Sequence, residues 1–507
     1  MEQQAGKVLP EDEHNRALMD HLHPGAYTNP SPAERYDLVV IGAGPAGLVS
    51  AAGAAGLGAK VALVERRLMG GDCLTVGCVP SKCLIASARA AHDARTANDF
   101  GLRITGEVEV DFPAVMERMR RLRASIARQD SVARYTELGV DVFLGPGRFR
   151  DAASVEVAGA TLPFRKAVIC TGTHPFIPPI EGLDAAPCLT NETVFSLTEL
   201  PRRLAVLGAG PIGCELAQAF RRFGSDVTLI HKGAHILDRE DADAAEIIQQ
   251  AFLREGIDLC LNATTTRVEK AASDLRLHLK SSDGEQTVEA DALLVSTGRA
   301  PNVDGLALEK AGVQYDTRRG VEVDDRLRTA NPNILAAGDV CSRYKFTHAA
   351  DAMARMAIQN ALFLGRKRVT DLTIPWCTYT DPEIGHVGTY PHELEESGAA
   401  YRTFTIPFAE VDRAVADGEP EGFVKVHAEQ NGDGILGATV VHRHAGDMIG
   451  ELAVAMAGKG GLGAVAGAIH PYPTQAEAIR KAGDAYSRTR LTPFVAGLLK
   501  RWLAWRR

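Results

Sequence analysis

Residues 36–47 read YDLVVIGAGPAG, an apolar run that leads directly into the pattern G-x-G-x-x-G. Such a run, bounded by glycines, predicts a buried strand and a tight turn into a helix. Small apolar residues follow, and a second apolar run, KVALVE, covers residues 60–65. The order strand, helix, strand predicts a parallel βαβ unit and an α/β fold.

The three glycines of this unit predict a site for the pyrophosphate of a dinucleotide. Gly42 allows the tight turn, Gly44 lets a phosphate approach the backbone, and Gly47 lets the helix lie close to the strand. The helix N-terminus directs free N–H groups at the same place, which favours an anion. Glu65 ends the second strand 23 residues after Gly42, where a carboxylate can hold a ribose 2′-hydroxyl.

The same pattern recurs further along the chain as LAVLGAGPIGCE. Its glycines are Gly208, Gly210 and Gly213, and an apolar strand follows the helix again. Here the 23-residue step from Gly208 reaches His231 and then Lys232, with no acid at that position. Because these side chains can hold a 2′-phosphate, the pattern favours NADPH over NADH, unless Lys232 simply points to solvent.

Between the two glycine patterns lies a Gly-rich turn with two cysteines, GGDCLTVGCVPSK, over residues 70–82. Cys73 and Cys78 are five positions apart, about 7.5 Å along a regular helix. A disulfide needs roughly 4.4–6.8 Å between Cα atoms, so the backbone must bend, and Gly77 supplies the freedom to do so. A helix that begins at Cys78 would lower the pKa of that thiol, and Lys82 adds positive charge one turn later.

Composition narrows the class of protein. At 507 residues we expect two to four domains, and a net charge of −8 argues against a nucleic-acid binder. The nine cysteines are scattered rather than arranged as the framework of a secreted domain. We find neither a signal-peptide core nor an apolar run long enough for a membrane span, so the sequence predicts a cytoplasmic protein.

The arginines of residues 116–123 are interspersed with acids and apolar residues, which predicts a solvated helix face.

Two dinucleotide units, a C-x4-C turn after the first and a Gly-Asp strand end after the second resemble the class I pyridine nucleotide-disulfide oxidoreductases. The likeness runs from about Tyr36 to Ala485, with mercuric reductase, dihydrolipoyl dehydrogenase and glutathione reductase as relatives. It implies FAD in the first unit, a nicotinamide cofactor in the second and a homodimer built by the last domain. It also implies a redox disulfide in which Cys78 lies nearest the flavin and Cys73 meets the substrate.

The likeness implies roles for further residues and a division of the chain. Lys82 would pair with Glu215 near the flavin, and Asp339 would hold the FAD ribityl chain. The candidate cofactor contacts are Gly42, Gly44, Gly47, Glu65, Lys82, Gly147, Thr171, Gly172, Gly208, Gly210, Gly213, Glu215, His231, Lys232, Gly298, Gly338 and Asp339. We predict an N-terminal extension (1–34), a two-part FAD-binding domain (36–184 and 306–370), an NAD(P)-binding domain (185–305), a dimerisation domain (371–487) and a basic amphipathic tail (488–507). No resident metal site is predicted.

The C-terminal motif departs from the disulfide-reducing branches. Those branches carry a His base directly before Pro-Thr, oriented by a Glu five residues later, whereas this chain has Tyr472 and Glu477. A phenol is a poor base near neutral pH. His470 is the alternative base, although two prolines stiffen the segment. Tyr at this position resembles mercuric reductase, yet no cysteine follows Cys377, so that enzyme's paired C-terminal thiols are missing.

Three functions remain open from the sequence. The first is an FAD enzyme that uses NADPH to reduce a soft electrophile, such as a metal ion, through Cys73 and Cys78. The second is a disulfide reductase of the dihydrolipoyl dehydrogenase or glutathione reductase type with His470 as base. The third is a flavin-bearing redox sensor or interaction protein without turnover. The tail from residue 488 is expected to dock on the dimer, with contact to an anionic membrane surface as the alternative.

Overall fold

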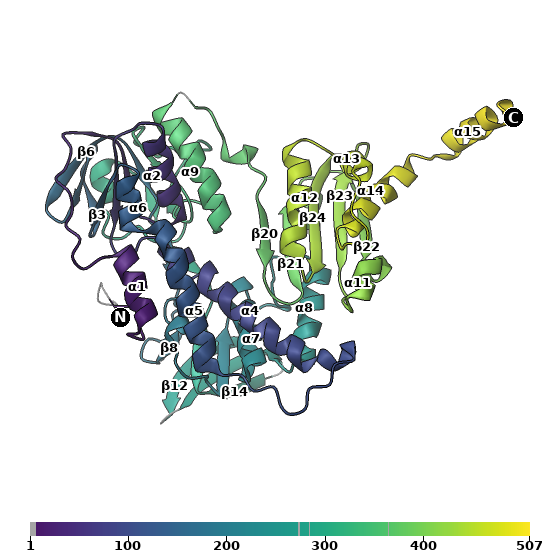
Figure 1. Cartoon of the computed structure of the whole chain (residues 1–507), viewed down its shortest axis with the longest axis horizontal. Coiled ribbons are helices and arrows are strands. Elements are labelled where there is room, and N and C mark those ends of the chain that lie inside the picture. Colours follow the sequence, from purple (N-terminus) through teal and green to yellow (C-terminus); the bar gives the residue numbers. More distant parts are fainter. Residues whose placement is uncertain (1–6, 272–273, 283, 364) are drawn as a thin grey trace. The chain divides into compact units, whose positions relative to one another are not determined.

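The chain forms two compact α/β units (Figure 1), which confirms the predicted fold class. The computed structural model describes residues 7–271, 274–282, 284–363 and 365–507. The first unit comprises the chain up to Ile230 together with Ala263–Leu372, and the second comprises His231–Asn262 and Thr373–Arg507. Within the described residues, no helix is both long and apolar enough to cross a bilayer.

The first sheet of the first unit contains the strand that leads into the first glycine pattern. Its parallel strands run in the order β3-β2-β1-β6-β19, and the glycine turn leaves the central strand β1. The bounds are β1 (Tyr36–Ile41), β2 (Val61–Glu65), β3 (Val140–Leu144), β6 (Ala160–Ile169) and β19 (Ile334–Ala336). The first part of β6 also pairs with an antiparallel extension, β4 (Gly147–Asp151) and β5 (Ser154–Val157). Fully buried aromatic side chains, including Tyr36 and Phe143, fill one core of this unit.

A second parallel sheet of the first unit contains the strand before the second glycine pattern. Its strands run β10-β9-β15-β8, and α7 follows the glycine turn as α2 does in the first sheet. The bounds are β8 (Cys188–Leu189), β9 (Arg203–Leu207), β10 (Asp226–Ile230), β15 (Ala292–Val295), α2 (Pro45–Gly56) and α7 (Pro211–Phe223). The predicted repeat of the βαβ pattern is therefore present. Smaller antiparallel pieces are β12 (Thr264–Ala271), β13 (Asp274–Ser281) and β14 (Gly284–Ala290), and the pairs β7 (Thr173–Pro175) with β16 (Arg299–Pro301) and β17 (Tyr315–Asp316) with β18 (Gly320–Val321).

Helices α1, α4 and α5 surround the cysteine turn. Their bounds, with those of the other helices of this unit, are α1 (Glu13–Leu22), α3 (Gly71–Thr75), α4 (Cys78–Arg95), α5 (Phe112–Ala127), α6 (Val132–Glu137) and α9 (Thr347–Leu362). The first helix, α1, lies in the predicted N-terminal extension and buries Leu18 and Leu22 completely while packing against α5. Part of the extension therefore belongs to the core of the first unit.

The prediction that the arginines of α5 form a solvated face is wrong for two of them. Arg120 and Arg123 are 8% and 2% exposed, because α1 covers the side of α5 on which they lie. Arg120 forms an ion pair with Asp12. Arg123 donates to the Asn15 side chain and to the Thr75 carbonyl, each at 2.7 Å. Since Thr75 lies between the two cysteines in sequence, Arg123 ties the N-terminal helix to the cysteine turn.

The second unit contains an antiparallel sheet with helices packed against it. The strand order is β20-β21-β24-β23-β22. The strands are β20 (Pro375–Thr378), β21 (Glu383–Gly388), β22 (Tyr401–Pro407), β23 (Phe423–Glu429) and β24 (Ile435–His442). The unit also contains β11 (Asp258–Cys260), which is not part of this sheet. The helices are α8 (Ala242–Arg254), α10 (Pro391–Glu396), α11 (Asp412–Ala416), α12 (Ala445–Ala457), α13 (Leu462–Gly467), α14 (Glu477–Thr489) and α15 (Pro493–Trp505). Apolar residues of the sheet and of α12, α13 and α14 form the core.

Candidate redox and cofactor site

The two cysteines lie at a break between α3, which carries Cys73, and α4, which begins at Cys78. Both are free thiols in this structure. A Cβ on Gly77 would meet the carbonyl oxygen of Asp72 at 2.7 Å. The bend predicted at Gly77 is present, and it depends on the missing side chain because a Cβ would clash with that oxygen.

The two thiols differ in acidity. A hydrogen bond from Cys73 lowers the pKa of Cys78 to about 6 against the opposing effect of burial, and Thr347 and the Lys82 charge act in the same direction as Cys73. The Thr347 hydroxyl oxygen lies 3.5 Å from the Cys78 sulfur. The same thiol-thiol hydrogen bond, together with burial, raises the pKa of Cys73. Near neutral pH, Cys78 is therefore the thiolate of the pair.

Lys82 lies one turn after Cys78 and pairs with Glu215 of α7. Its Nζ donates to Glu215 Oε2 at 2.8 Å, and the Glu215 side chain is only 7% exposed. Because α4 packs against α7, the pair joins the cysteine helix to the helix of the second glycine pattern. This is the ion pair that the family likeness implied.

The two glycine patterns have the same backbone geometry. Gly42 and Gly208 have φ angles of +100° and +106°, in the left-handed region that favours glycine. A Cβ on Gly47 would lie 1.7 Å from the Gly42 oxygen, and one on Gly213 would lie 2.0 Å from the Gly208 oxygen. These four positions exclude side chains, as the predicted tight turns and close helix packing require.

The middle glycine of each pattern has no clashing neighbour in the direction of a side chain. A Cβ on Gly210 would meet no atom within 4 Å, and one on Gly44 would meet only the Gly71 Cα, at 3.8 Å. Each helix then begins with a proline, Pro45 or Pro211, and the following N–H groups are free at the helix start. Open space beside free N–H groups fits the pyrophosphate of a dinucleotide in both loops.

Two carboxylates, the buried Glu65 and the half-buried Asp339, lie at the ends of parallel strands of the first sheet, where ligands of open α/β sheets bind. Glu65 ends β2 and accepts backbone N–H groups of Ala43 and Arg67, both at 2.7 Å, while burial raises its pKa. Asp339 follows β19 and accepts the Thr173 hydroxyl at 3.2 Å. A carboxylate has about four acceptor positions, so both groups retain capacity for the hydroxyls of FAD.

His231 and Lys232 follow directly after β10 and differ in exposure. The His231 ring is buried, its Nε2 lies 3.5 Å from Asp238 Oδ2, and a Cβ on Gly233 would approach that nitrogen to 2.6 Å. Burial lowers the pKa of His231, so the ring is neutral near pH 7. Lys232 is exposed. Of the two residues predicted to hold a 2′-phosphate, only Lys232 supplies charge.

The remaining cofactor candidates fall into two groups. Gly172 and Gly298 have positive φ angles and no atom within 4 Å in the Cβ direction. Gly147 and Gly338 are packed against side chains, which a Cβ would meet at 2.8 and 3.2 Å. The Thr171 hydroxyl donates to a backbone carbonyl at 2.7 Å. Of these positions, Gly172 and Gly298 therefore leave room for a bound dinucleotide.

The sequence reasoning missed a half-buried arginine beside the cysteine turn. Arg299 of β16 forms an ion pair with Asp72, which precedes Cys73. Its guanidinium also donates to Thr173 Oγ1 at 2.6 Å and to Asn191 Oδ1 at 3.3 Å. Asp72, an acid within a Gly-rich turn, was the only sequence signal of this ion pair, and its partner Arg299 lies 227 positions away.

The C-terminal candidates are engaged within the second unit. Tyr472 is 70% exposed and donates to Asp412 Oδ2 at 2.8 Å, and this hydrogen bond raises the pKa of the phenol. Glu477 begins α14 and pairs with Arg480 at 3.3 Å. At neutral pH Tyr472 is therefore a protonated phenol, poorly suited to accept a proton.

His470, the alternative base, has both ring nitrogens engaged. Its Nε2 lies 2.7 Å from Glu451 Oε1, and its Nδ1 lies 3.1 Å from the Ala468 carbonyl oxygen. A general base needs a nitrogen available to the substrate's proton. In this arrangement His470 has none to offer without breaking one of these contacts.

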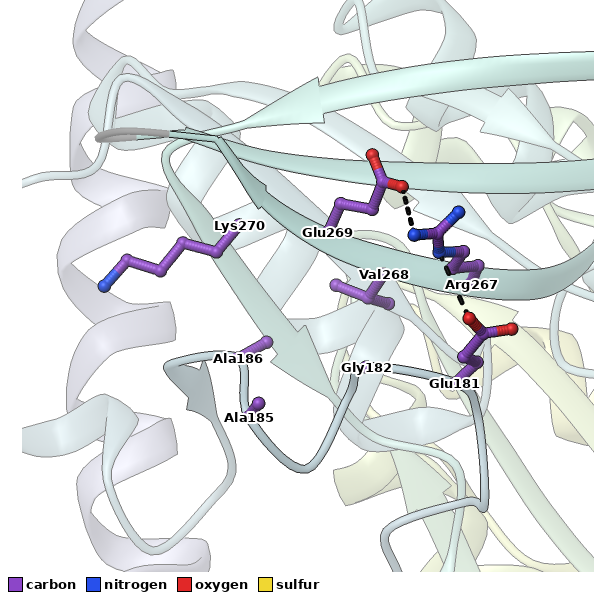
Figure 2. Close-up of a pocket in the computed structure, with 8 residues that line it drawn as sticks. All are labelled: Glu181, Gly182, Ala185, Ala186, Arg267, Val268, Glu269 and Lys270. Carbon is purple, nitrogen blue, oxygen red and sulfur yellow. Dashed lines mark ion pairs between the residues drawn. The ribbon is translucent and has the colours of Figure 1, made fainter.

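A surface pocket of about 380 Å³ lies between the loop 181–186 and β12. Figure 2 shows Arg267 between Glu181 and Glu269. Its Nε lies 3.3 Å from Glu181 Oε1, and its Nη2 lies 2.7 Å from Glu269 Oε1. The two carboxylates balance its charge, and the lining includes none of the candidate residues. The pocket is therefore not part of the candidate site.

Comparisons with known proteins agree with these features. The pyridine nucleotide-disulphide oxidoreductase family model matches residues 36–354, and that family's dimerisation domain matches residues 374–483. The chain is 36% identical over 459 residues to a mercuric reductase of Streptomyces lividans, covering 89% of this chain and 96% of that protein. It is 34% identical over 450 residues to a dihydrolipoyl dehydrogenase of Chlamydia muridarum, covering 88% and 95%.

Solved structures give the same result. LpdA from Mycobacterium tuberculosis superposes with a TM-score of 0.81 at 29% identity, covering 89% of this chain and 99% of that one. A Cu(II) complex of the HOCl-induced flavoprotein disulfide reductase RclA from Escherichia coli gives 0.78 at 28% identity, covering 88% and 98%. The chain therefore belongs, as its motifs predicted, to the class I pyridine nucleotide-disulphide oxidoreductases, flavin enzymes that depend on FAD and NAD(P)H, and it carries the family's dimerisation domain.

Proposed function

We propose that this enzyme uses NADPH and FAD to reduce a soft electrophile, a thiophilic metal ion such as Hg(II), through Cys73 and Cys78. The observation that carries the proposal is the state of the C-terminal candidates. Tyr472 is a phenol with a raised pKa, and His470 is held by Glu451. A disulfide substrate leaves as thiols and needs protons delivered, whereas a metal ion that accepts two electrons does not.

The thiol pair suits such an acceptor. When bound, FAD would supply the means to take up the nicotinamide hydride and to pass an electron pair to the disulfide. Two thiols within hydrogen-bond reach, one of them a thiolate near neutral pH, form a soft donor pair that selects thiophilic ions. The disulfide re-forms when the ion has taken two electrons, so one NADPH is consumed for each Hg(II) reduced to Hg(0). The likeness to mercuric reductases and to the Cu(II) complex of RclA supports this chemistry.

The residue after β10 supports NADPH as the reductant. An acid at the position of His231 would repel a 2′-phosphate, whereas the neutral ring does not, and exposed Lys232 can pair with it. We further infer a homodimer working in the cytoplasm, where a reversible disulfide of this kind is normally catalytic. The dimerisation domain supports the first of these points.

One structural observation supports the alternative function, a disulfide reductase. His470 and Glu451 form a His-carboxylate pair at 2.7 Å, the arrangement by which a carboxylate orients a histidine base. The likeness to a dihydrolipoyl dehydrogenase supports the same reading. In that case substrate binding must free one ring nitrogen of His470.

Anaerobic NADPH oxidation separates the alternatives. We expect sustained turnover with Hg(II) in the presence of excess thiol, exceeding turnover with oxidised lipoamide or glutathione disulfide. Cys73→Ser should lose about 10³-fold or more of this activity, while Cys83→Ser serves as the matched control. Faster turnover with a disulfide would overturn the proposal. Oxidation that stops after a single equivalent of NADPH would instead identify a redox sensor.

A further inference from the structure

The C-terminal helix α15 is left unexplained by the redox chemistry. It spans Pro493–Trp505, it is capped by Thr492, whose hydroxyl accepts the Val495 N–H, and it buries no residue. Phe494 and Trp505 are 79% and 77% exposed. A soluble helix normally buries one apolar stripe, so α15 presents a face that needs a partner.

The apolar residues of α15 gather on one side. At 100° per residue they fall within about half the circumference of the helix. They are Phe494, Val495, Leu498, Leu499, Trp502, Leu503 and Trp505. Lys500 and Arg501 lie outside this arc, and Trp502 and Trp505 are in ring contact, with centroids 5.3 Å apart.

The charge of this segment has a single sign. Asp484 is the last acidic residue of the chain, and six cations follow it: Arg488, Arg490, Lys500, Arg501, Arg506 and Arg507. With a total of −8, the chain up to Asp484 carries −14, because −14 and +6 make −8. The cations occur before, within and after the helix. A series spread in this way suits a diffuse anionic surface better than a single protein pocket.

We propose that α15 docks on an anionic phospholipid surface, with its Trp- and Leu-rich face at the headgroup boundary and Lys500 and Arg501 toward the lipid phosphates. Helices with these two faces lie in the plane of the interface. The described residues offer no membrane-spanning helix, so this contact is peripheral and reversible. A second copy of this chain, the partner expected from the sequence, is the competing occupant, and the experiment below distinguishes the two.

The test uses the full-length holoenzyme and vesicles of phosphatidylcholine with or without phosphatidylglycerol. We expect co-flotation only with phosphatidylglycerol, release by high salt, and a blue shift of tryptophan emission. Replacing Lys500, Arg501, Arg506 and Arg507 by Gln should weaken binding about fivefold per cation removed. The matched control replaces four exposed cations elsewhere by Gln: Arg103, Arg121, Arg318 and Arg366. NADPH oxidation in solution should be unchanged in both variants.

Two further variants complete the test. A chain that ends at Arg490 should remain dimeric and lose vesicle binding. In a Trp502→Phe, Trp505→Phe variant, Trp376 is the one remaining tryptophan, so the emission shift should disappear. Equal binding to both vesicle types, or binding that survives truncation, would overturn the proposal. A truncated chain that elutes as a monomer, with no vesicle binding by the wild type, would assign α15 to a second copy instead.

Discussion

The two glycine loops share a backbone and differ in what surrounds it. In both, the first glycine has a positive φ angle and the third lies against the first. The first loop contacts the cysteine turn, because the Gly70 N–H donates to the Ala43 carbonyl at 2.8 Å and Gly71 lies against Gly44. The second loop has no atom within 4 Å of the Cβ position of Gly210.

The strands that follow the two loops end differently as well. Glu65 is a buried carboxylate held by two backbone N–H groups, whereas His231 is a buried neutral ring followed by exposed Lys232. The shared backbone geometry suits a pyrophosphate in both loops. The different surroundings and strand ends suit two different dinucleotides. The first loop lies against the cysteine turn, and the second has room beside Gly210, as an exchanging nucleotide in our proposal would require.

Gly71→Ala should have the largest effect, because it disturbs the contact between the first loop and the cysteine turn, which the second loop lacks. A Cβ there would lie 2.6 Å from the Gly44 Cα, and Gly71 has a φ angle of +58°. We expect a loss of about 1–3 kcal/mol or more from strain and overpacking. The purified Gly71→Ala protein should be depleted in FAD, as measured by the ratio of flavin to protein absorbance.

The matched control is Gly210→Ala, whose Cβ meets only open space. It should keep its FAD and its thermal midpoint, and raise the KM for NADPH by about tenfold, or 1.4 kcal/mol, where a phosphate approaches. Equal FAD loss in both variants would show that the loops do not differ as described.

Arg123→Met tests whether the cysteine turn beside the first loop depends on the N-terminal helix. The substitution leaves the Asn15 oxygen and the Thr75 carbonyl without their buried donor, at a cost of about 1–3 kcal/mol. We expect a lower thermal midpoint and faster alkylation of Cys73. Arg121 is exposed on the same helix, so Arg121→Met should change stability by no more than about 0.5 kcal/mol. Similar midpoints for the two variants would remove Arg123 from this role.

His231→Glu sharpens the comparison by giving the second loop the acid of the first. We expect kcat/KM for NADPH to fall about tenfold, equivalent to 1.4 kcal/mol, with NADH favoured. Lys232→Ala should weaken NADPH use in the same direction and leave NADH unchanged. Steady-state kinetics with both nucleotides measures the ratio, and an unchanged ratio in both variants would refute the assignment.

Lys82 and Glu215, which join the cysteine helix α4 to the helix α7 of the second loop, should produce the smallest effect. Lys82 lowers the pKa of Cys78 and Glu215 raises it. In the reduced enzyme the pH midpoint for Cys78 alkylation should therefore rise above about 6 in Lys82→Met and fall below it in Glu215→Gln. Shifts of the same sign in both variants would contradict this electrostatic account.

The sequence predicted the parts of the fold that depend on backbone requirements. A glycine pattern after an apolar strand specifies a turn, a close helix approach and an α/β sheet, and both units have them. The start of α4 at Cys78 followed from a proline and glycine beside the cysteines. Each of these signals acts within a few residues.

Contacts between distant side chains could not be read in the same way. The series of arginines in α5 indicated a solvated face, yet α1 buries Arg120 and Arg123. Asp72 and Arg299 are 227 positions apart, and no local pattern joins them. His231 lies 3.5 Å from Asp238 and close to Gly233, which the 23-residue step does not encode. These features depend on tertiary packing, which a single sequence does not show.

The central claim is that Cys78 is the thiolate of a redox pair beside the flavin, and anaerobic two-electron reduction tests it most directly. The reduced holoenzyme should show the long-wavelength absorbance of a thiolate against oxidised flavin. Since the pKa of Cys78 is lowered to about 6, the band should persist at neutral pH and fade as the pH drops through about 6. Cys78→Ser should lack the band, and Cys83→Ser should keep it. A wild-type enzyme without the band, or a Cys78→Ser variant that retains it, would contradict the account.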